Sequence, residues 1–416
     1  MPQGVIQLAY LGPQDKFITG DPQLSYFCSV MKQTTRFAIE SCRQYFIGGA
    51  DFGKTSDVIL ERIGDLVHQM FLEIQLPELN SLVPNRPPDI TYGYINSIGH
   101  ALIESIEIFI GAQKIDQSYG AWLEIWTELT IPQEKEEAYF NMIGKHRIFT
   151  AESNSKAMMV QVPLQFWFNR DVSLALPLIA IQRDNVRLRF QFRPYQQCWT
   201  SNDMQDPPTN PFLNGVHFTS AFLWVDYIYL DKEERRKFAE TPHQYMIEQV
   251  QINSFDLEEN VPIQNIELNF NHPVKEIYWT FQNPDVLTYS PNTNPNFFNY
   301  STALNIEDPN AQDPMVSAKL KFENIDRMEE RPAQYYQVIQ PFQYHTRVPK
   351  NFIHTYSFCL YPEQLQPSGT CNFSRIDTCV LYAHLQPNLP DYRLLCFALN
   401  YNFLIITGGL AGVLYK

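Results

Sequence analysis

The chain has 416 residues, which suits two domains of about 200 residues better than one. Hydrophobic residues make up 44% of the sequence and charged residues 18%, which excludes a largely disordered protein. The net charge is −14 and no dense cluster of Lys or Arg occurs, which argues against a protein that wraps nucleic acid. The aromatic content of 14% and the 29 prolines favour an all-β chain with long loops.

The first segment, Met1–Gln7, lacks the basic region and apolar run of a signal peptide, so we expect a protein that is not secreted. Residues 1–22 are expected to form an N-terminal arm. Strand candidates then follow one another through the first half of the chain. They lie near residues 24–31, 36–46, 56–62, 67–76, 101–111, 158–168, 186–192 and 218–230.

The segment Val186–Arg193 shows the strand pattern most clearly. Val, Leu, Phe and Phe alternate there with Arg, Arg, Gln and Arg, which predicts a strand with one buried face and one wet face. Strands of this kind, with few helices between them, exclude a doubly wound parallel sheet and leave sandwiches or barrels.

Two helices are predicted. In Tyr119–Leu129 the apolar residues Trp122, Ile125, Trp126 and Leu129 have helical spacing, and we expect this stripe to pack on a sheet edge. The second helix, Asp231–Glu240, begins at a plausible N-cap, is polar on most faces and ends before Pro242. Because it lies just past the middle of the chain, we place the domain boundary there.

The second half of the chain repeats the strand pattern. Its candidates lie near residues 244–254, 266–270, 274–282, 318–322, 353–360, 376–384 and 394–406. Proline- and asparagine-rich stretches cannot continue a sheet ladder and are predicted loops. They are Pro84–Pro88, Asp206–Pro211 and Pro291–Pro295. The closing apolar stretch, Phe403–Tyr415, is too short and too rich in glycine for a membrane helix and predicts a final strand and turn.

No motif for catalysis or cofactor binding is found. The nine histidines include no H-E-x-x-H pair, and His345 in Tyr344–Arg347 is the nearest candidate for a site. Nucleotide-binding and nucleophile-elbow motifs are missing, and the many carboxylates single out no glycosidase-like pair. The seven cysteines are scattered, which favours buried thiols in a reducing compartment over disulfides or zinc ligands. We therefore expect no enzyme, cofactor or metal.

Two N-glycosylation sequons occur, at Asn299 and Asn372. Without a signal peptide, chance is the better explanation of both, and they are kept only as possible glycosylation sites.

Several stretches resemble the major capsid proteins of large icosahedral DNA viruses, of the algal-virus and iridovirus type. The most specific is Gln366–Asp377, with the sequence QPSGTCNFSRID. Further similar stretches follow in the family's order along the whole chain. They are Gln7–Asp15, Thr19–Phe27, Phe37–Ser41, Ala175–Gln182, Trp224–Asp231, Leu268–Pro273, Asn400–Ile406 and Gly409–Tyr415.

The resemblance implies an all-β chain of two tandem eight-stranded antiparallel jelly rolls, with a few short helices in loops and at the linker. We then expect an arm at 1–22, a first jelly roll at 23–230, a helical linker at 231–243 and a second jelly roll at 244–416. In such a family three copies form a pseudo-hexagonal capsomer, and capsomers tile an icosahedral shell. The family has no catalytic residues to carry over.

The implied partners are two further copies in a homotrimer, neighbouring capsomers and minor capsid proteins beneath the shell. An internal virion membrane would lie nearby without being crossed, nucleic acid would not be bound directly, and assembly would occur in the host cytoplasm. Three alternatives stay open: a minor capsid protein, a glycan-binding attachment protein on the same fold, and an enzyme on a similar sandwich. Native mass, a glycan array, and a search for convergent titratable groups in a pocket would distinguish them.

Overall fold

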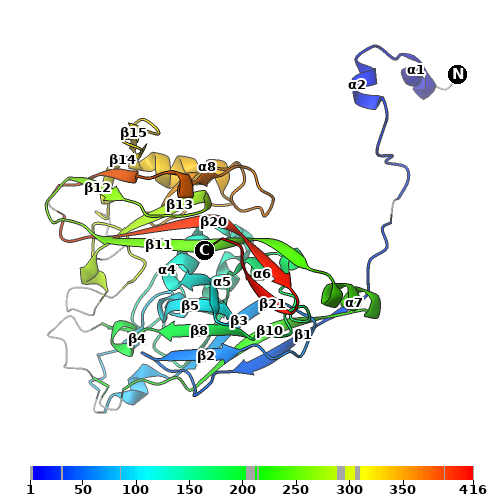
Figure 1. Ribbon diagram of the computed structural model, residues 1–416. Helices are drawn as coiled ribbons and strands as arrows, with labels where there is room; N and C mark the ends of the chain where they lie inside the picture. The colour runs from blue at the N-terminus through cyan, green and yellow to red at the C-terminus, as the bar shows by residue number, and fades with distance from the viewer. Residues whose placement is uncertain are drawn as a thin grey trace. The chain divides into compact units, whose positions relative to one another are not determined.

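The computed structural model describes residues 3–29, 31–84, 86–202, 211–212, 215–287, 296–304, 310–387 and 389–415 (Figure 1). The chain divides into two units, Met1–Arg36 and Phe37–Lys416, and each is treated by itself below. The predicted loops at 206–211 and 291–295 lie almost wholly outside the described residues.

The first unit is an arm with two short helices, α1 (Gln3–Ala9) and α2 (Asp15–Thr19). None of its described residues is buried, and apolar side chains such as Phe17 and Phe27 are almost fully exposed. The prediction of a strand near 24–31 is wrong for the described residues there, which form turns and bends. A strand needs a paired neighbour, and within this unit the described residues include no other strand.

The first jelly roll consists of two four-stranded antiparallel sheets, with the orders β1-β10-β3-β7 and β2-β8-β5-β6. The strands of the first sheet are β1 (Phe37–Tyr45), β3 (Leu66–Leu76), β7 (Met158–Pro163) and β10 (Ser220–Leu230). Those of the second are β2 (Thr55–Ile59), β5 (Ile103–Ile110), β6 (Gln113–Tyr119) and β8 (Val186–Phe192). The residues of β8 alternate between buried and more exposed, as the sequence predicts.

The second jelly roll also has two antiparallel sheets, with the main orders β11-β20-β13-β17 and β12-β19-β14-β15. The first contains β11 (His243–Asp256), β13 (Pro273–Gln282), β17 (His354–Ser357) and β20 (Arg393–Thr407). The second contains β12 (Ile263–Glu267), β14 (Met315–Phe322), β15 (Ile325–Asp326) and β19 (Cys379–Leu385).

The two halves repeat one topology. In each, the first, eighth, third and sixth main strands form one sheet, and the second, seventh, fourth and fifth form the other. The fold is thus a double jelly roll, as the resemblance implied. Short additional strands are β4 (Tyr92–Tyr94), β9 (Trp199–Ser201), β16 (Arg331–Pro332), β18 (Cys371–Asn372) and β21 (Leu410–Val413). The closing strand and turn are confirmed by β20 and β21, joined at Gly408 and Gly409, which both have positive φ.

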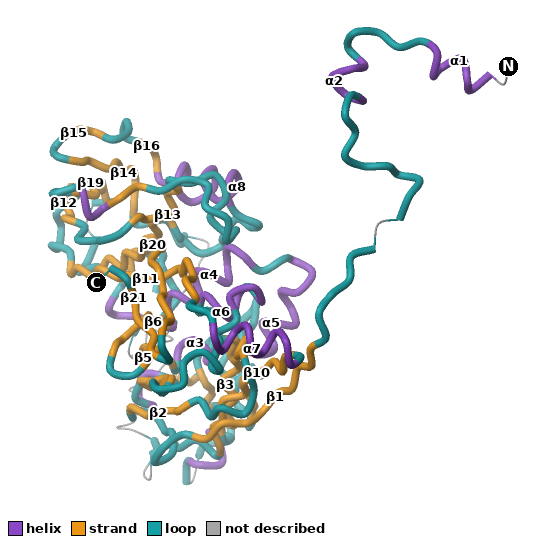
Figure 2. Tube along the Cα trace, turned by 45° about the vertical axis from the view of Figure 1, so that its right-hand side comes forward, coloured by secondary structure: helices purple, strands orange, loops and turns teal. Residues whose placement is uncertain are grey.

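Helices fill the connections between strands. They are α3 (Ile98–Ala101), α4 (Gly120–Thr130), α5 (Glu136–Ile143), α6 (Trp167–Arg170), α7 (Lys232–Glu240) and α8 (Gln340–Tyr344). In both jelly rolls the link from the fifth to the sixth strand is helical: α4 and α5 precede β7, and α8 precedes β17. Figure 2 shows how these helices gather beside the strands. Among the described residues, no helix is long and apolar enough to cross a membrane.

Helix α4 joins the two jelly rolls, and its prediction from spacing is confirmed. Trp122 is buried and its ring lies 5.1 Å from Tyr278 on β13 and 5.7 Å from Phe397 on β20, measured between centroids. The stripe therefore packs on a sheet, but Trp122 contacts the two central strands of that sheet and not the predicted edge, and the sheet belongs to the other jelly roll. At the start of the helix, a Cβ on Gly120 would lie 2.2 Å from the His100 carbonyl oxygen, so only glycine fits.

Helix α7 forms at the predicted place, and none of its residues is buried. The Asp231 side chain accepts a hydrogen bond from the Lys232 amide, as expected of an N-cap. The main core cluster nevertheless runs across both jelly rolls, from Leu72 and Phe190 to Leu399. The exact limits of the four expected segments stay a prediction.

Candidate functional site

The outer face of the first sheet carries exposed apolar side chains. β1 is an edge strand, paired on one side with β10. On its outward side Phe37, Ile39 and Tyr45 are all more than half exposed, whereas Phe46, just beyond the strand, points into the core. An exposed apolar row on an edge strand is typical of a surface that is covered on association.

The neighbouring strand extends this row. Phe222 and Trp224 of β10 lie opposite Tyr45 and Arg43 in the register. The Arg43 guanidinium carbon lies 4.4 Å from the Phe222 ring centroid and 4.7 Å from that of Trp224. We call Phe37, Ile39, Arg43, Tyr45, Phe222 and Trp224 the β1 surface. Its aromatic and aliphatic side chains can pack against another protein but carry no catalytic group.

The opposite end of the body exposes a second uncovered sheet face. On β12-β19-β14-β15, alternate residues such as Leu381 are buried, whereas the intervening ones are half-buried or exposed. The ammonium groups of Lys319 and Lys321 each lie about 5 Å from the Tyr382 ring centroid. We call Ile263, Lys319, Lys321 and Tyr382 the β19 surface.

The junction between the jelly rolls has a fixed geometry. It brings β6 of the first jelly roll beside β11 of the second, where Val250 N donates to Asp116 Oδ1 at 3.1 Å. Burial raises the pKa of Asp116 to about 7. Tyr119 on β6 also lies 6.1 Å from Phe397 on β20, between ring centroids. The second sheet of the first jelly roll, β2-β8-β5-β6, thus faces the first sheet of the second jelly roll, β11-β20-β13-β17, within one chain.

Ion pairs cross the same junction. Arg170 of α6 binds Glu248 of β11 at 2.9 Å, and the fully buried Lys275 of β13 binds the same carboxylate. Farther along, Arg347 after α8 binds Glu136 of α5 at 2.6 Å. Charges that are buried and paired in this way fix relative orientation more than they add stability.

His345, the nearest candidate for a site in the sequence, lies in a buried cluster. Its Nε2 is 2.9 Å from Glu276 and its Nδ1 is 3.0 Å from Glu363, while the Tyr278 hydroxyl also donates to Glu276. Burial lowers the pKa of His345, but the two carboxylates outweigh it and raise that pKa to about 9. The imidazolium side chain is wholly buried, so it joins α8 to its surroundings and cannot meet a substrate.

The two sequons differ in accessibility. Asn299 is 1% exposed, and its Nδ2 donates to the carbonyl groups of Ala303 and Leu304. Asn372 on β18 is exposed, and its Oδ1 accepts from the Ser374 amide. Of the two amide nitrogens, only that of Asn372 can be reached by an enzyme in the folded chain.

In the described ranges, neither the cysteines nor the other residue types that bind metals form a disulfide or metal site. The seven cysteines are free thiols, and four of them, Cys198, Cys359, Cys379 and Cys396, are buried as expected, whereas Cys28 is exposed. Over the same residues no group of three His, Cys, Asp or Glu side chains is placed to hold a metal ion.

Sequence reasoning missed the β1 surface. It predicted the strand near 36–46 but not that apolar side chains occupy both of its faces. A signal was present, because Phe37 and Ile39 are odd-numbered whereas Cys42 and Phe46 are even-numbered. Apolar residues at both parities indicate a strand that is covered on both sides.

Comparison with known proteins identifies the family to which this fold belongs. The family model for the major capsid protein N-terminus matches residues 25–231, and that for the large eukaryotic DNA virus major capsid protein matches residues 234–412. The chain is 35% identical to the major capsid protein of Pyramimonas orientalis virus, over 99% of both chains. It is 32% identical to that of Phaeocystis pouchetii virus, over the whole of both.

The chain belongs to the family of major capsid proteins of large eukaryotic DNA viruses. Its role is therefore structural, and its place is the capsid of a virion. The fold agrees with this assignment: a solved structure of the PBCV-1 virus capsid superposes with a TM-score of 0.79 at 28% identity, covering 94% of this chain and 100% of that one. For a capsid protein the functional site is the surface that meets other copies, so the β1 and β19 surfaces are its candidates.

Proposed function

We propose that three copies of this capsid protein close into a homotrimeric, pseudo-hexagonal capsomer that tiles an icosahedral shell. The observation that carries this proposal is the junction inside one chain. There the second sheet of the first jelly roll faces the first sheet of a second jelly roll with the same topology. Repeating that contact from chain to chain generates a ring, and three chains supply six jelly rolls.

The same reasoning assigns the surfaces in contact. The sheets left uncovered in one chain are β12-β19-β14-β15 and β1-β10-β3-β7. In a closed ring, the β19 surface of one copy would face the β1 surface of the next. The character of the two faces supports this pairing, because Lys321, which unlike Lys319 forms no ion pair among the described residues, complements Glu73 and Asp226 beside Trp224 on the other face.

Native mass spectrometry and light scattering of the purified chain test the proposal. We expect a species of about 146 kDa, three times the 48.5 kDa chain. A monomer that persists at micromolar concentration would contradict it. Mass-spectrometric copy number in purified virions would separate a major from a minor shell component, since a major one must far outnumber the other capsid proteins.

The surfaces are tested by Tyr45→Glu and Tyr382→Glu. Each places a charge in one half of the proposed contact, and each should weaken trimer formation at least ten-fold in its dissociation constant. The matched control is Ile148→Glu, because Ile148 is 79% exposed in a loop outside both surfaces. Trimers of unchanged stability in both test variants would refute the assignment of the surfaces.

The other partners form part of the same proposal. The exposed apolar side chains of the arm would be covered by assembly, in contact with neighbouring capsomers or with minor capsid proteins beneath the shell. We propose assembly in the host cytoplasm near an internal virion membrane, with no direct binding of nucleic acid, which the net charge of −14 supports. Cross-linking mass spectrometry of virions would identify what the arm touches, and cross-links to genome-binding proteins alone would count against it.

The chain is proposed to have no catalytic activity and no cofactor. The histidine–carboxylate cluster around His345 supports this, because its groups bind one another in the protein interior. For glycosylation, Asn372 is the one accessible candidate of the two sequons. Glycopeptide analysis should find Asn299 unmodified, because a glycan there would break the two hydrogen bonds that its amide donates.

A further inference from the structure

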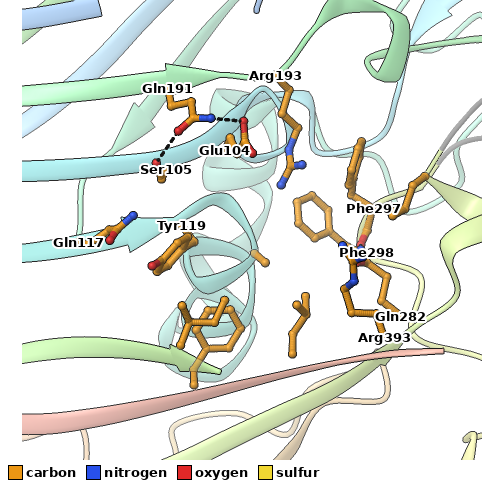
Figure 3. Close-up of a pocket in the computed structure, with 15 residues that line it drawn as sticks. Glu104, Ser105, Gln117, Tyr119, Gln191, Arg193, Gln282, Phe297, Phe298 and Arg393 are labelled. Atoms are coloured by element: carbon orange, nitrogen blue, oxygen red, sulfur yellow. Dashed lines mark hydrogen bonds between the residues drawn. The ribbon is translucent and has the colours of Figure 1, made fainter. Parts of the chain in front are cut away.

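A cavity of about 300 Å³ lies at the junction of the two jelly rolls, within a single copy (Figure 3). Its walls come from β5, β6 and β8 on one side and from β11, β13 and β20 on the other. Aromatic rings of Tyr119, Phe297, Phe298 and Phe397 line it together with polar side chains. The capsid function derived above makes no use of this space.

Arg193, just after β8, places an unpaired cation in the cavity. Its guanidinium stacks on the Phe297 ring, with the central carbon 4.4 Å from the ring centroid. Its Nε is buried and has no hydrogen-bond partner in the described chain, and no carboxylate there forms an ion pair with it. Burial lowers the pKa of Arg193, yet an arginine stays charged at neutral pH.

The neighbouring carboxylate, Glu104, keeps its charge but makes its direct contact with a neutral amide and not with Arg193. Glu104 accepts a hydrogen bond from Gln191 at 2.7 Å, and Gln191 in turn accepts from Ser105, as Figure 3 shows. A second arginine in the lining, Arg393, is paired with Asp256 at 2.7 Å. Arg193 is thus the arginine of the lining that forms no ion pair in the described chain, although the charge of Glu104 acts on it from a distance and partly offsets the lowering of its pKa by burial. A largely buried cation without a direct partner is costly.

We propose that this cavity binds a small organic anion, with an oxyanion head on Arg193 and a compact apolar body among the aromatic rings. The guanidinium fork suits a carboxylate or a phosphate, which present two oxygens in one plane. The remaining lining suits a flat or short apolar group, because Ile252, Leu287 and Leu395 join the rings. Since the walls come from both jelly rolls, such a ligand would brace the junction.

The test measures thermal stability and calorimetric binding on the purified, assembled protein. The probes are phenyl phosphate, benzoate and inorganic phosphate, each at 10 mM and constant ionic strength. We expect at least one aromatic anion to raise the melting temperature by about 2–4 °C, with inorganic phosphate giving a smaller shift. Phenyl phosphate and benzoate distinguish a phosphate from a carboxylate head.

Two substitutions examine the site. Arg193→Met should weaken binding of the aromatic anion at least ten-fold while leaving the unliganded melting temperature unchanged or higher, since it removes a charge without a partner. The control is Arg187→Met, on β8 itself but paired with Asp57 outside the cavity, and it should bind as the wild type does. Should Arg193→Met fail to fold, Gln117→Trp fills the cavity from its β6 side and should abolish binding.

Three results would overturn the proposal. They are the absence of any shift in the wild-type protein, an equal shift with inorganic phosphate alone, and a shift that survives in both Arg193→Met and Gln117→Trp. None of these outcomes bears on trimer formation, because every described residue that lines the cavity belongs to one copy.

Discussion

Replacing Trp122 with alanine should lower the free energy of unfolding by about 4 kcal/mol. Trp122 is 1% exposed and its ring contacts Tyr278, Phe397 and Trp126. A buried tryptophan removes roughly 200 Å² from water, which at about 25 cal/mol per Å² gives an upper estimate near 5 kcal/mol. Measured losses for comparable truncations are about 3–5 kcal/mol.

The assay is urea unfolding followed by fluorescence and circular dichroism, at one fixed protomer concentration because association adds to apparent stability. Since the ring belongs to one jelly roll and two of its partners, Tyr278 and Phe397, belong to the other, the substitution should destabilise both halves together. Ile148→Ala is the control, because Ile148 is 79% exposed in a loop outside both proposed contact surfaces, and its truncation should cost under about 0.5 kcal/mol. A loss below about 2 kcal/mol, or a shift in only one of two separate transitions, would refute the shared core.

Three further predictions follow from buried groups. The pKa of His345 is about 9 in the folded chain and about 6.5 when unfolded, so the stability that its protonated form adds is complete below pH 6.5 and is lost as pH rises through 9. Urea unfolding at a series of pH values should show that the wild type loses about 3 kcal/mol more unfolding free energy over this range than His345→Gln does. Parallel curves for the two proteins would contradict this. Arg347→Met should lower the free energy of unfolding by about 2 kcal/mol in chemical unfolding, because Arg347 is largely buried against Glu136. Arg147 binds the same carboxylate but is exposed, so Arg147→Met should lower it by under about 0.5 kcal/mol. Equal losses for the two variants would contradict this reasoning. Gly120→Ala should cost about 2–3 kcal/mol by calorimetry, because its Cβ meets the His100 carbonyl, and an unchanged melting temperature would show that the backbone adjusts.

Period-two alternation predicted most long strands because those strands have one buried face. β8 and β14 lie close to their predicted positions for this reason. β6 was missed because its seven residues are mainly polar, and the buried Asp116 among them is held at the junction by the Val250 amide. The wrong strand near 24–31 shows the reverse case, in which an apolar segment has no neighbour within its own unit.

The functional surfaces could be predicted only in part, for a physical reason. Local pattern reports whether a side chain is buried, but not whether the burial happens within one chain or between chains. In the sequence, Phe37, Ile39 and Tyr45 look like residues of an ordinary strand. Only the structure shows that their side chains are uncovered in the single chain. Arg193 is a second residue whose environment the sequence does not predict. The alternation of β8 predicts that it faces solvent, whereas in the structure residues of the second jelly roll enclose a cavity around it.

The shared core bears directly on the proposed ring. Assembling a ring from six separate jelly rolls would cost the translational and rotational freedom of five of them, about 4–15 kcal/mol each, whereas assembling it from three fused chains costs the freedom of only two. Fusion through α4 and the Lys275–Glu248–Arg170 cluster makes three of the six contacts intramolecular and fixes their angle. Each remaining contact then needs to be strong enough only to close a three-membered ring. A chain whose junction is loosened, as in Trp122→Ala, should therefore lose trimer stability even though Trp122 lies in neither proposed contact surface.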